Sequence, residues 1–255
     1  MKRILFIGDI IGKPGRQVVA DFVPAFREKQ RVDLVIGNVE NAAGGFGITP
    51  ALAKDLFSFL DVMTSGNHIW DKKEVYDYIE KEPRLIRPAN FPPKNPGKGF
   101  FEKANVLVIN LIGRVFMPHY DCPFRAIDAL LSEKKKKGQI ILVDMHAEAT
   151  SEKQAMKHYL DGRVSAIVGT HTHVPTDDLE LSPKGTAYVT DVGMTGPADS
   201  IIGMEKEEII QKFLTQMPAR FNVATGPSVL NAVLLEVDEE TGKAHSITRI
   251  KEKRN

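Results

Sequence analysis

The residues of this chain that could most clearly do chemistry are two histidines one position apart, His171 and His173. They follow the apolar run 166–168, so they stand where a buried strand is expected to end and a loop to begin. Imidazoles placed in this way are typical metal ligands, although a polar loop with two incidental histidines would have the same sequence. The metal interpretation therefore needs partners elsewhere in the chain.

Four other apolar runs also end on side chains that can bind metal. These side chains are Asp9, the pair Glu40 and Asn41, the pair Asn67 and His68, and His146. In an open α/β sheet, residues at the carboxyl ends of different strands converge on one crevice. Carboxylate, carboxamide and imidazole groups suit hard or borderline divalent ions. Asp9 taken alone could equally cap the start of a helix.

The composition limits the class of protein and of partner. A length of 255 residues with 42% hydrophobic and 26% charged residues fits one α/β domain over 1–255 with a substantial core. The formal net charge of +1 gives no general attraction to nucleic acid or to an anionic membrane. We therefore expect no extended nucleic-acid groove and no membrane partner, and an anionic substrate must be attracted locally.

Cysteine usage and the amino terminus indicate a cytoplasmic protein. The single cysteine, Cys122, excludes an internal disulfide framework and a thiolate metal cluster. The apolar run after Met1 is cut short at Asp9, so it does not form the core of a signal peptide. No later run approaches the ~18 to 20 apolar residues of a membrane helix. Homo-oligomerisation is left open by the sequence.

Strand and helix patterns alternate along the chain, which predicts parallel pairing. Thr49 and Pro50 are a typical helix cap and first-turn proline. The proline-rich segment 82–99 is expected to be an ordered loop, and the lysine run 134–137 is expected to be a solvated helix end rather than a nucleic-acid patch. The remaining expected elements are strands near 2–7, 100–101, 106–110, 139–143 and 185–190, helices near 16–28, 72–80, 127–137 and 151–160, and a closing hairpin of 229–237 with 245–250.

Taken in order, the motifs at 8–9, 66–68, 146 and 169–173 resemble those of the calcineurin-like metallophosphoesterases. Two departures are informative: Ile11 replaces the first histidine of that superfamily, and segment 37–41 replaces its bridging aspartate segment. These departures resemble the YmdB-like bacterial branch. The same branch is indicated by segments 41–43, 66–71, 87–92, 121–125 and 146–154.

The resemblance implies a fold, a cofactor and a set of ligands. The fold would be a four-layer α/β/β/α sandwich of two mixed sheets flanked by helices, which the strand pattern alone does not distinguish from a doubly wound sheet. The cofactor would be two divalent or trivalent metal ions, with iron first and manganese or zinc as alternatives. One ion would be held by Asp9, Asn41 and His173, the other by Asn67, His146 and His171, with Glu40 as the bridge. Asn38, Thr170 and Thr172 would orient these ligands.

The activity implied by the resemblance is hydrolysis of cyclic nucleotides, including 2',3'-cyclic AMP. The nucleophile would be a hydroxide that bridges the ions, since two divalent cations lower the pKa of a shared water. His68 would be the proton donor to the leaving ribose oxygen; its alternative is a solvent-facing position at the start of a helix. Two other functions remain open, a phosphomonoesterase of the same superfamily and a low-turnover regulatory binder stabilised by metal.

Overall fold

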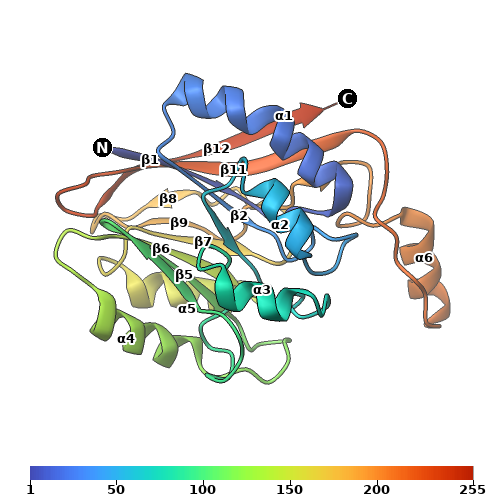
Figure 1. Cartoon of the computed structure of the whole chain (residues 1–255), viewed down its shortest axis with the longest axis horizontal. Coiled ribbons are helices and arrows are strands. Elements are labelled where there is room, and N and C mark those ends of the chain that lie inside the picture. Colours follow the sequence, from blue (N-terminus) through green and yellow to red (C-terminus); the bar gives the residue numbers. More distant parts are fainter. Residues whose placement is uncertain (255) are drawn as a thin grey trace.

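The first strand, β1 (Lys2–Ile7), is apolar on both faces, and its alternate side chains belong to two different cores. Ile4 and Phe6 pack with residues of a second sheet, whereas Leu5 and Ile7 pack with residues of the neighbouring helices. A strand buried on both faces must lie inside a layered structure. The computed structural model describes residues 1–254 and has this layered form, with helices on the outer sides of two facing sheets (Figure 1).

The first sheet has the strand order β10-β11-β1-β2-β3, with β12 paired to β11. Strands β1, β2 and β3 are parallel, while β11 runs antiparallel to β1 and β12 antiparallel to β11. The remaining members are β2 (Leu34–Asn38), β3 (Val62–Thr64), β10 (Gly196–Pro197), β11 (Ser228–Val237) and β12 (Ala244–Arg254). The parallel strands all present their carboxyl ends at one edge.

The second sheet has the order β4-β5-β6-β7-β9-β8. Its inner strands β5, β6, β7 and β9 are parallel, and β4 and β8 are antiparallel strands at its edges. The bounds are β4 (Phe100–Lys103), β5 (Val106–Ile112), β6 (Ile140–His146), β7 (Ala166–Thr170), β8 (Glu180–Leu181) and β9 (Ala187–Val189). Both sheets are therefore mixed.

Helices cover the outer face of each sheet. The first sheet packs against α1 (Gly12–Gln30), α2 (Pro50–Leu56) and α3 (Val75–Lys81), and the second against α4 (Pro123–Lys134) and α5 (Thr150–Leu160). Figure 1 shows α1 on one side of the two sheets and α4 and α5 on the other. The expected four-layer α/β/β/α sandwich is confirmed.

Most expected elements are present, with shifted ends. Thr49 caps α2 by accepting a hydrogen bond from the Leu52 amide, and segment 82–99 is an ordered loop in which Leu85 and Ile86 are fully buried. Helix α4 begins at Pro123, earlier than expected, and ends at Lys134, so the lysine run lies at a helix end. No element is expected from the sequence at α6 (Lys206–Thr215), a helix at the edge of the molecule (Figure 1). None of the helices within residues 1–254 combines the length and the hydrophobicity that a membrane span requires.

Candidate metal centre

The predicted donors all follow strands whose carboxyl ends meet at one edge of the sandwich. Each strand is a buried apolar run that ends abruptly in polar residues, because the chain leaves the core at that point. Asp9 follows β1, Glu40 and Asn41 follow β2, Asn67 and His68 follow β3, His146 ends β6, and His171 and His173 follow β7.

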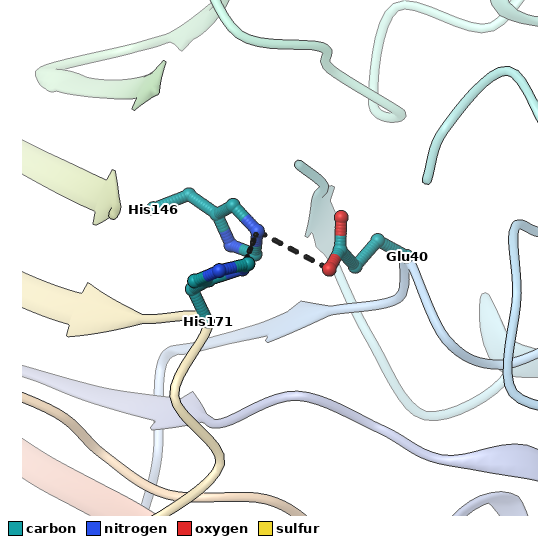
Figure 2. Close-up of side chains that lie close together, drawn as sticks. All are labelled: Glu40, His146 and His171. Atoms are coloured by element: carbon teal, nitrogen blue, oxygen red, sulfur yellow. Dashed lines mark hydrogen bonds and ion pairs between the residues drawn. The ribbon is translucent and has the colours of Figure 1, made fainter. Parts of the chain in front are cut away.

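Three donor atoms converge on the imidazole of His146. Its Nε2 lies 3.2 Å from Oε1 of Glu40, 3.1 Å from Oδ1 of Asn67 and 3.1 Å from Nδ1 of His171. Figure 2 shows Glu40 and His171 directed at the same edge of the His146 ring. Donors about 3 Å apart have the spacing of neighbouring ligands around an ion about 2.1 Å from each. Within residues 1–254, no other trio of His, Cys, Asp or Glu donors converges within 4.8 Å.

A second set of donors lies beside the first and contains buried oxygens with no partner. Oδ1 of Asp9 and Oδ1 of Asn41 are buried and accept no hydrogen bond from residues 1–254. His173 uses Nδ1 to donate to the Ile202 carbonyl at 2.9 Å, which leaves its Nε2 with a lone pair. Unpaired buried oxygens are costly unless a cation or water satisfies them. The donor set therefore fits a second ion.

The electrostatics of the metal-free centre also favour a cation. Burial opposes charge on Glu40, but the charge of His146 and its hydrogen bond outweigh burial and lower the pKa of Glu40 to about 2. Burial likewise opposes the charge of His146, yet Glu40 and Asp9 raise its pKa to about 9. Burial and the charge of His146 lower the pKa of His171 to about 3. Burial raises the pKa of Asp9 despite the nearby histidines. The two carboxylates thus draw positive charge to the ring of His146, which a bound cation can supply once Nε2 is deprotonated.

Gly66 is required for the close approach of these ligands. A Cβ atom at this position would lie 2.2 Å from Nε2 of His146 and 2.4 Å from Oε2 of Glu40. Both distances are far below van der Waals contact. The turn after β3 can therefore pass beneath the centre only with glycine at this position.

A buried chain of hydrogen bonds fixes which nitrogen of His146 faces the centre. Thr170 Oγ1 donates to Asp144 Oδ1 at 2.7 Å and lies 2.9 Å from Nδ1 of His146. Since the hydroxyl proton goes to Asp144, Nδ1 of His146 is the donor to Thr170, and Nε2 is the ring nitrogen directed at Glu40 and the neighbouring donors. Asn38 also donates to Asp144, at 3.1 Å. Burial raises the pKa of Asp144 to about 6.

His171 is oriented from the solvent side. Its Nε2 lies 3.2 Å from Oε2 of Glu148, a half-exposed side chain at the rim of the centre. Because Nε2 carries the proton given to this carboxylate, Nδ1 is left with the lone pair that could bind a metal ion. His171 also donates its backbone N–H to Oδ2 of Asp9 at 3.2 Å, which ties the two sets of donors together.

His68 lies at the edge of the centre and is held from two sides. Its backbone N–H donates to Oε2 of Glu40 at 3.0 Å, and its ring Nδ1 lies 2.8 Å from Oδ2 of Asp71. Phe46 packs edge-on against the ring, with centroids 5.1 Å apart. His68 lines a cavity of about 370 Å³ together with Glu40 and His173. The ring nitrogen opposite Asp71, Nε2, is the atom available to a molecule in that cavity.

All eight predicted site residues are thus brought to one place, and five more join them that sequence reasoning did not assign. Asp144 could have been found, because it lies two positions before His146 and so on the same face of β6. Asp71 could also have been found, because a residue three positions after His68 can lie beside it in a helical turn. Glu148 and Lys153 lie in segment 146–154, which indicates the family, but their roles and that of Asp191 depend on partners distant in sequence.

Comparisons with known proteins agree with this geometry. The family model described as YmdB-like protein matches residues 5–250. A Bacillus subtilis (strain 168) protein named 2',3'-cyclic-nucleotide 2'-phosphodiesterase is 52% identical over 253 residues, covering 97% of this chain and 96% of its own.

Two solved structures have the same fold over nearly the whole chain. A Thermus thermophilus protein has a TM-score of 0.93 at 46% identity, covering 99% of this chain and 100% of its own. A Mycoplasma pneumoniae protein described as a novel phosphatase also has a TM-score of 0.93, at 35% identity, covering 99% of this chain and 93% of its own. The chain belongs to the YmdB-like family of metallophosphoesterases.

Proposed function

We propose that this member of the YmdB-like phosphoesterases hydrolyses cyclic nucleotides of the 2',3'-cyclic AMP type with two bound metal ions. The observation that carries the proposal is the convergence of Glu40, Asn67, His146 and His171 around one point, with His68 hydrogen-bonded to the same glutamate. The activity named for the Bacillus subtilis relative supports the choice of substrate. We also propose that residues 1–255 act as a single domain, in the cytoplasm.

The ligands divide into two sets that share Glu40. We assign Asp9, Asn41 and His173 to one ion and Asn67, His146 and His171 to the other, because the unpaired oxygens lie in the first set and the tight cluster in the second. When bound, such ions acidify a water molecule and offset the charge of a phosphoryl group. Nitrogen and oxygen ligands without thiolate suit iron, manganese or zinc.

His68 supplies the proton that the leaving group needs. When water attacks phosphorus, the bond between phosphorus and the ribose oxygen breaks, and that oxygen leaves as a strongly basic alkoxide unless it is protonated. His68 donates the proton from Nε2, while Asp71 accepts the hydrogen bond of Nδ1–H and holds the ring. The backbone bond from His68 to Glu40 fixes its distance from the metal ligands.

The cavity favours a diester over a monoester. Among residues 1–254, no lysine or arginine lines it, and Glu148 adds a carboxylate at its rim. A cyclic diester carries one negative charge, whereas a phosphomonoester carries up to two, so a rim carboxylate opposes the monoester more. Phe46, Ile202 and Phe221 are among the apolar residues that line it, and apolar side chains suit the flat face of a nucleobase. These features support the diesterase over the phosphomonoesterase, and the held proton donor supports turnover over a regulatory binder.

The experiment that tests the proposal compares substrates on protein of known metal content. The protein is purified without chelator, and its rates on 2',3'-cyclic AMP, 3',5'-cyclic AMP and p-nitrophenyl phosphate are measured before and after dialysis against a chelator. We expect the highest kcat/KM on the 2',3'-cyclic diester and loss of that activity on chelation. A higher kcat/KM on the monoester, or activity that survives complete metal removal, would contradict the proposal.

A further inference from the structure

A buried lysine lies near the start of α5, where a positive charge is unfavourable. Lys153 is 1% exposed, and the partial positive charge of a helix N-terminus repels a cation placed close to it. Its ammonium group donates to Oδ2 of Asp191 at 2.8 Å, and Asp191 is fully buried. An ion pair so deeply buried gives little net stability. Its presence beside the metal centre therefore calls for another explanation.

The pair contacts the two-histidine loop on both sides of His171. Lys153 Nζ donates to the carbonyl of Thr170 at 2.7 Å. Oδ2 of Asp191 accepts from the backbone N–H of Thr172 at 3.1 Å and from its hydroxyl at 2.8 Å. Oδ1 of Asp191 accepts from the amide of Gly193 at 2.8 Å. One ion pair thus fixes the residue before His171 and the residue between the two histidines.

The loop needs this support because its backbone is strained. His171 has a φ of 99° and His173 a φ of 67°, a left-handed region that residues other than glycine rarely adopt. Such conformations persist only where the surroundings enforce them. Segment 190–194 lies directly against the loop and the end of β7: the Met194 amide donates to the His173 carbonyl at 3.0 Å, and a Cβ atom on Gly169 would come 1.7 Å from the Thr190 carbonyl oxygen.

We propose that Lys153 and Asp191 are positioning residues that hold the loop in the bent form in which His171 and His173 can both bind metal. The inference rests on the ligand set of the proposed function. It adds that a buried ion pair outside that set determines how tightly the ions are held. Two apolar side chains could fill the same space, but they could not accept from the Thr172 amide or donate to the Thr170 carbonyl.

The test measures Mn²⁺ binding to metal-free protein by EPR titration, with the urea unfolding midpoint of each metal-free variant measured in parallel. Removing one partner strands a buried charge and could unfold the protein, so the main variant is the double substitution Lys153→Met with Asp191→Leu. The matched control is Lys157→Met, four residues along the same helix, which removes the ion pair of Lys157 with the exposed Glu180. A milder variant, Thr172→Val, keeps the pair but removes one of its bonds to the loop.

We expect the double variant to bind Mn²⁺ about 10- to 100-fold more weakly than wild type, the range for residues that orient metal ligands. Lys157→Met should bind Mn²⁺ with the affinity of the wild type. Thr172→Val should have an Mn²⁺ affinity between those of the wild type and the double variant, and an unfolding midpoint close to that of the wild type. If the double variant does not fold, Thr172→Val decides: unchanged Mn²⁺ affinity overturns the inference. Wild-type affinity in a folded double variant overturns it as well. A wild-type protein that binds no Mn²⁺ would instead overturn the ligand set of the proposed function.

Discussion

Nδ1 of His68 lies 2.8 Å from Oδ2 of Asp71, three residues further along the chain, at the mouth of the cavity that contains the candidate metal ligands. A carboxylate that accepts from one ring nitrogen holds the imidazole in a single orientation. The other nitrogen, Nε2, can then give its proton to a leaving group. In the proposed function, His68 and Asp71 therefore act together.

The contribution of His68 and Asp71 to kcat should depend on the leaving group of the substrate. We expect His68→Ala to reduce kcat on 2',3'-cyclic AMP by about 10²- to 10⁴-fold, the usual contribution of a general acid. Asp71→Asn should cause a smaller loss in the same direction. On bis(p-nitrophenyl) phosphate, whose leaving group needs no proton, both losses should shrink to a fewfold. Steady-state kinetics on protein of measured metal content checks this, and equal losses on both substrates would remove the proton-donor role.

Gly66 should tolerate no side chain. In Gly66→Ala the new Cβ would collide with Nε2 of His146 and Oε2 of Glu40, so both ligands must move apart. We expect the purified variant to lose most of its metal while it remains folded. Gly44→Ala is the comparison, because a Cβ there meets open space and adds only the cost of its positive φ, about 1 kcal/mol. Metal analysis measures the metal content of both variants, and circular dichroism checks that both are folded. Full metal content in Gly66→Ala would contradict the assignment of His146 and Glu40 as ligands.

Glu148 should influence the choice between singly and doubly charged substrates. Glu148→Gln keeps an acceptor for Nε2 of His171 but removes the charge at the rim. We expect the ratio of kcat/KM for a nucleoside monophosphate over the cyclic diester to rise about fivefold, the size expected for one screened charge in a half-exposed position. The effect should weaken as salt is added. A ratio that does not change while metal content is preserved would show that Glu148 only orients His171.

Asp178 should make the stability of the metal-free protein depend on pH in the acid range. Burial opposes its charge, but hydrogen bonds from Thr176 and Thr190 outweigh burial and lower its pKa below the ordinary value of 3.8. A carboxyl with a lowered pKa in the folded state stabilises the protein above its unfolded pKa, and this contribution is lost as pH falls through the lower folded value.

The corresponding experiment compares the free energy of unfolding of wild type and Asp178→Asn in urea. We expect the variant to be less stable at pH 7 and the difference to shrink as the pH falls below 3.8. The exposed neighbour Asp177, changed to Asn, should show little difference at either pH. A difference between wild type and Asp178→Asn that stays constant down to pH 3 would contradict this account.

The sequence was most informative where an apolar run ends in a polar residue. Strands β1, β2, β6 and β7 are buried on both faces, so the first donors after them had to lie at the sheet edge. The same pattern could not assign strands to sheets. The long β11 pairs antiparallel with β1 although 220 or more positions separate them, and no local pattern encodes that partner.

The residues that orient the candidate ligands could not be predicted from the sequence for a related reason. Lys153 looks like an ordinary polar residue of an amphipathic helix, and Asp191 like a loop residue, until the fold places them 2.8 Å apart. Glu148 likewise acquires its role only from the position of His171. The candidate metal ligands could be named from residue type, spacing and family resemblance, whereas the groups that orient them depend on contacts between distant segments.

The central claim is that the chain holds two metal ions between Glu40 and the histidines. Its most direct test is the metal content of wild type and of Glu40→Ala and His146→Ala, purified without chelator and measured by inductively coupled plasma mass spectrometry. We predict about two ions per chain in the wild type and less than one in each variant, with all three proteins folded. A wild-type protein without bound metal, or variants that retain two ions per chain, would contradict the claim.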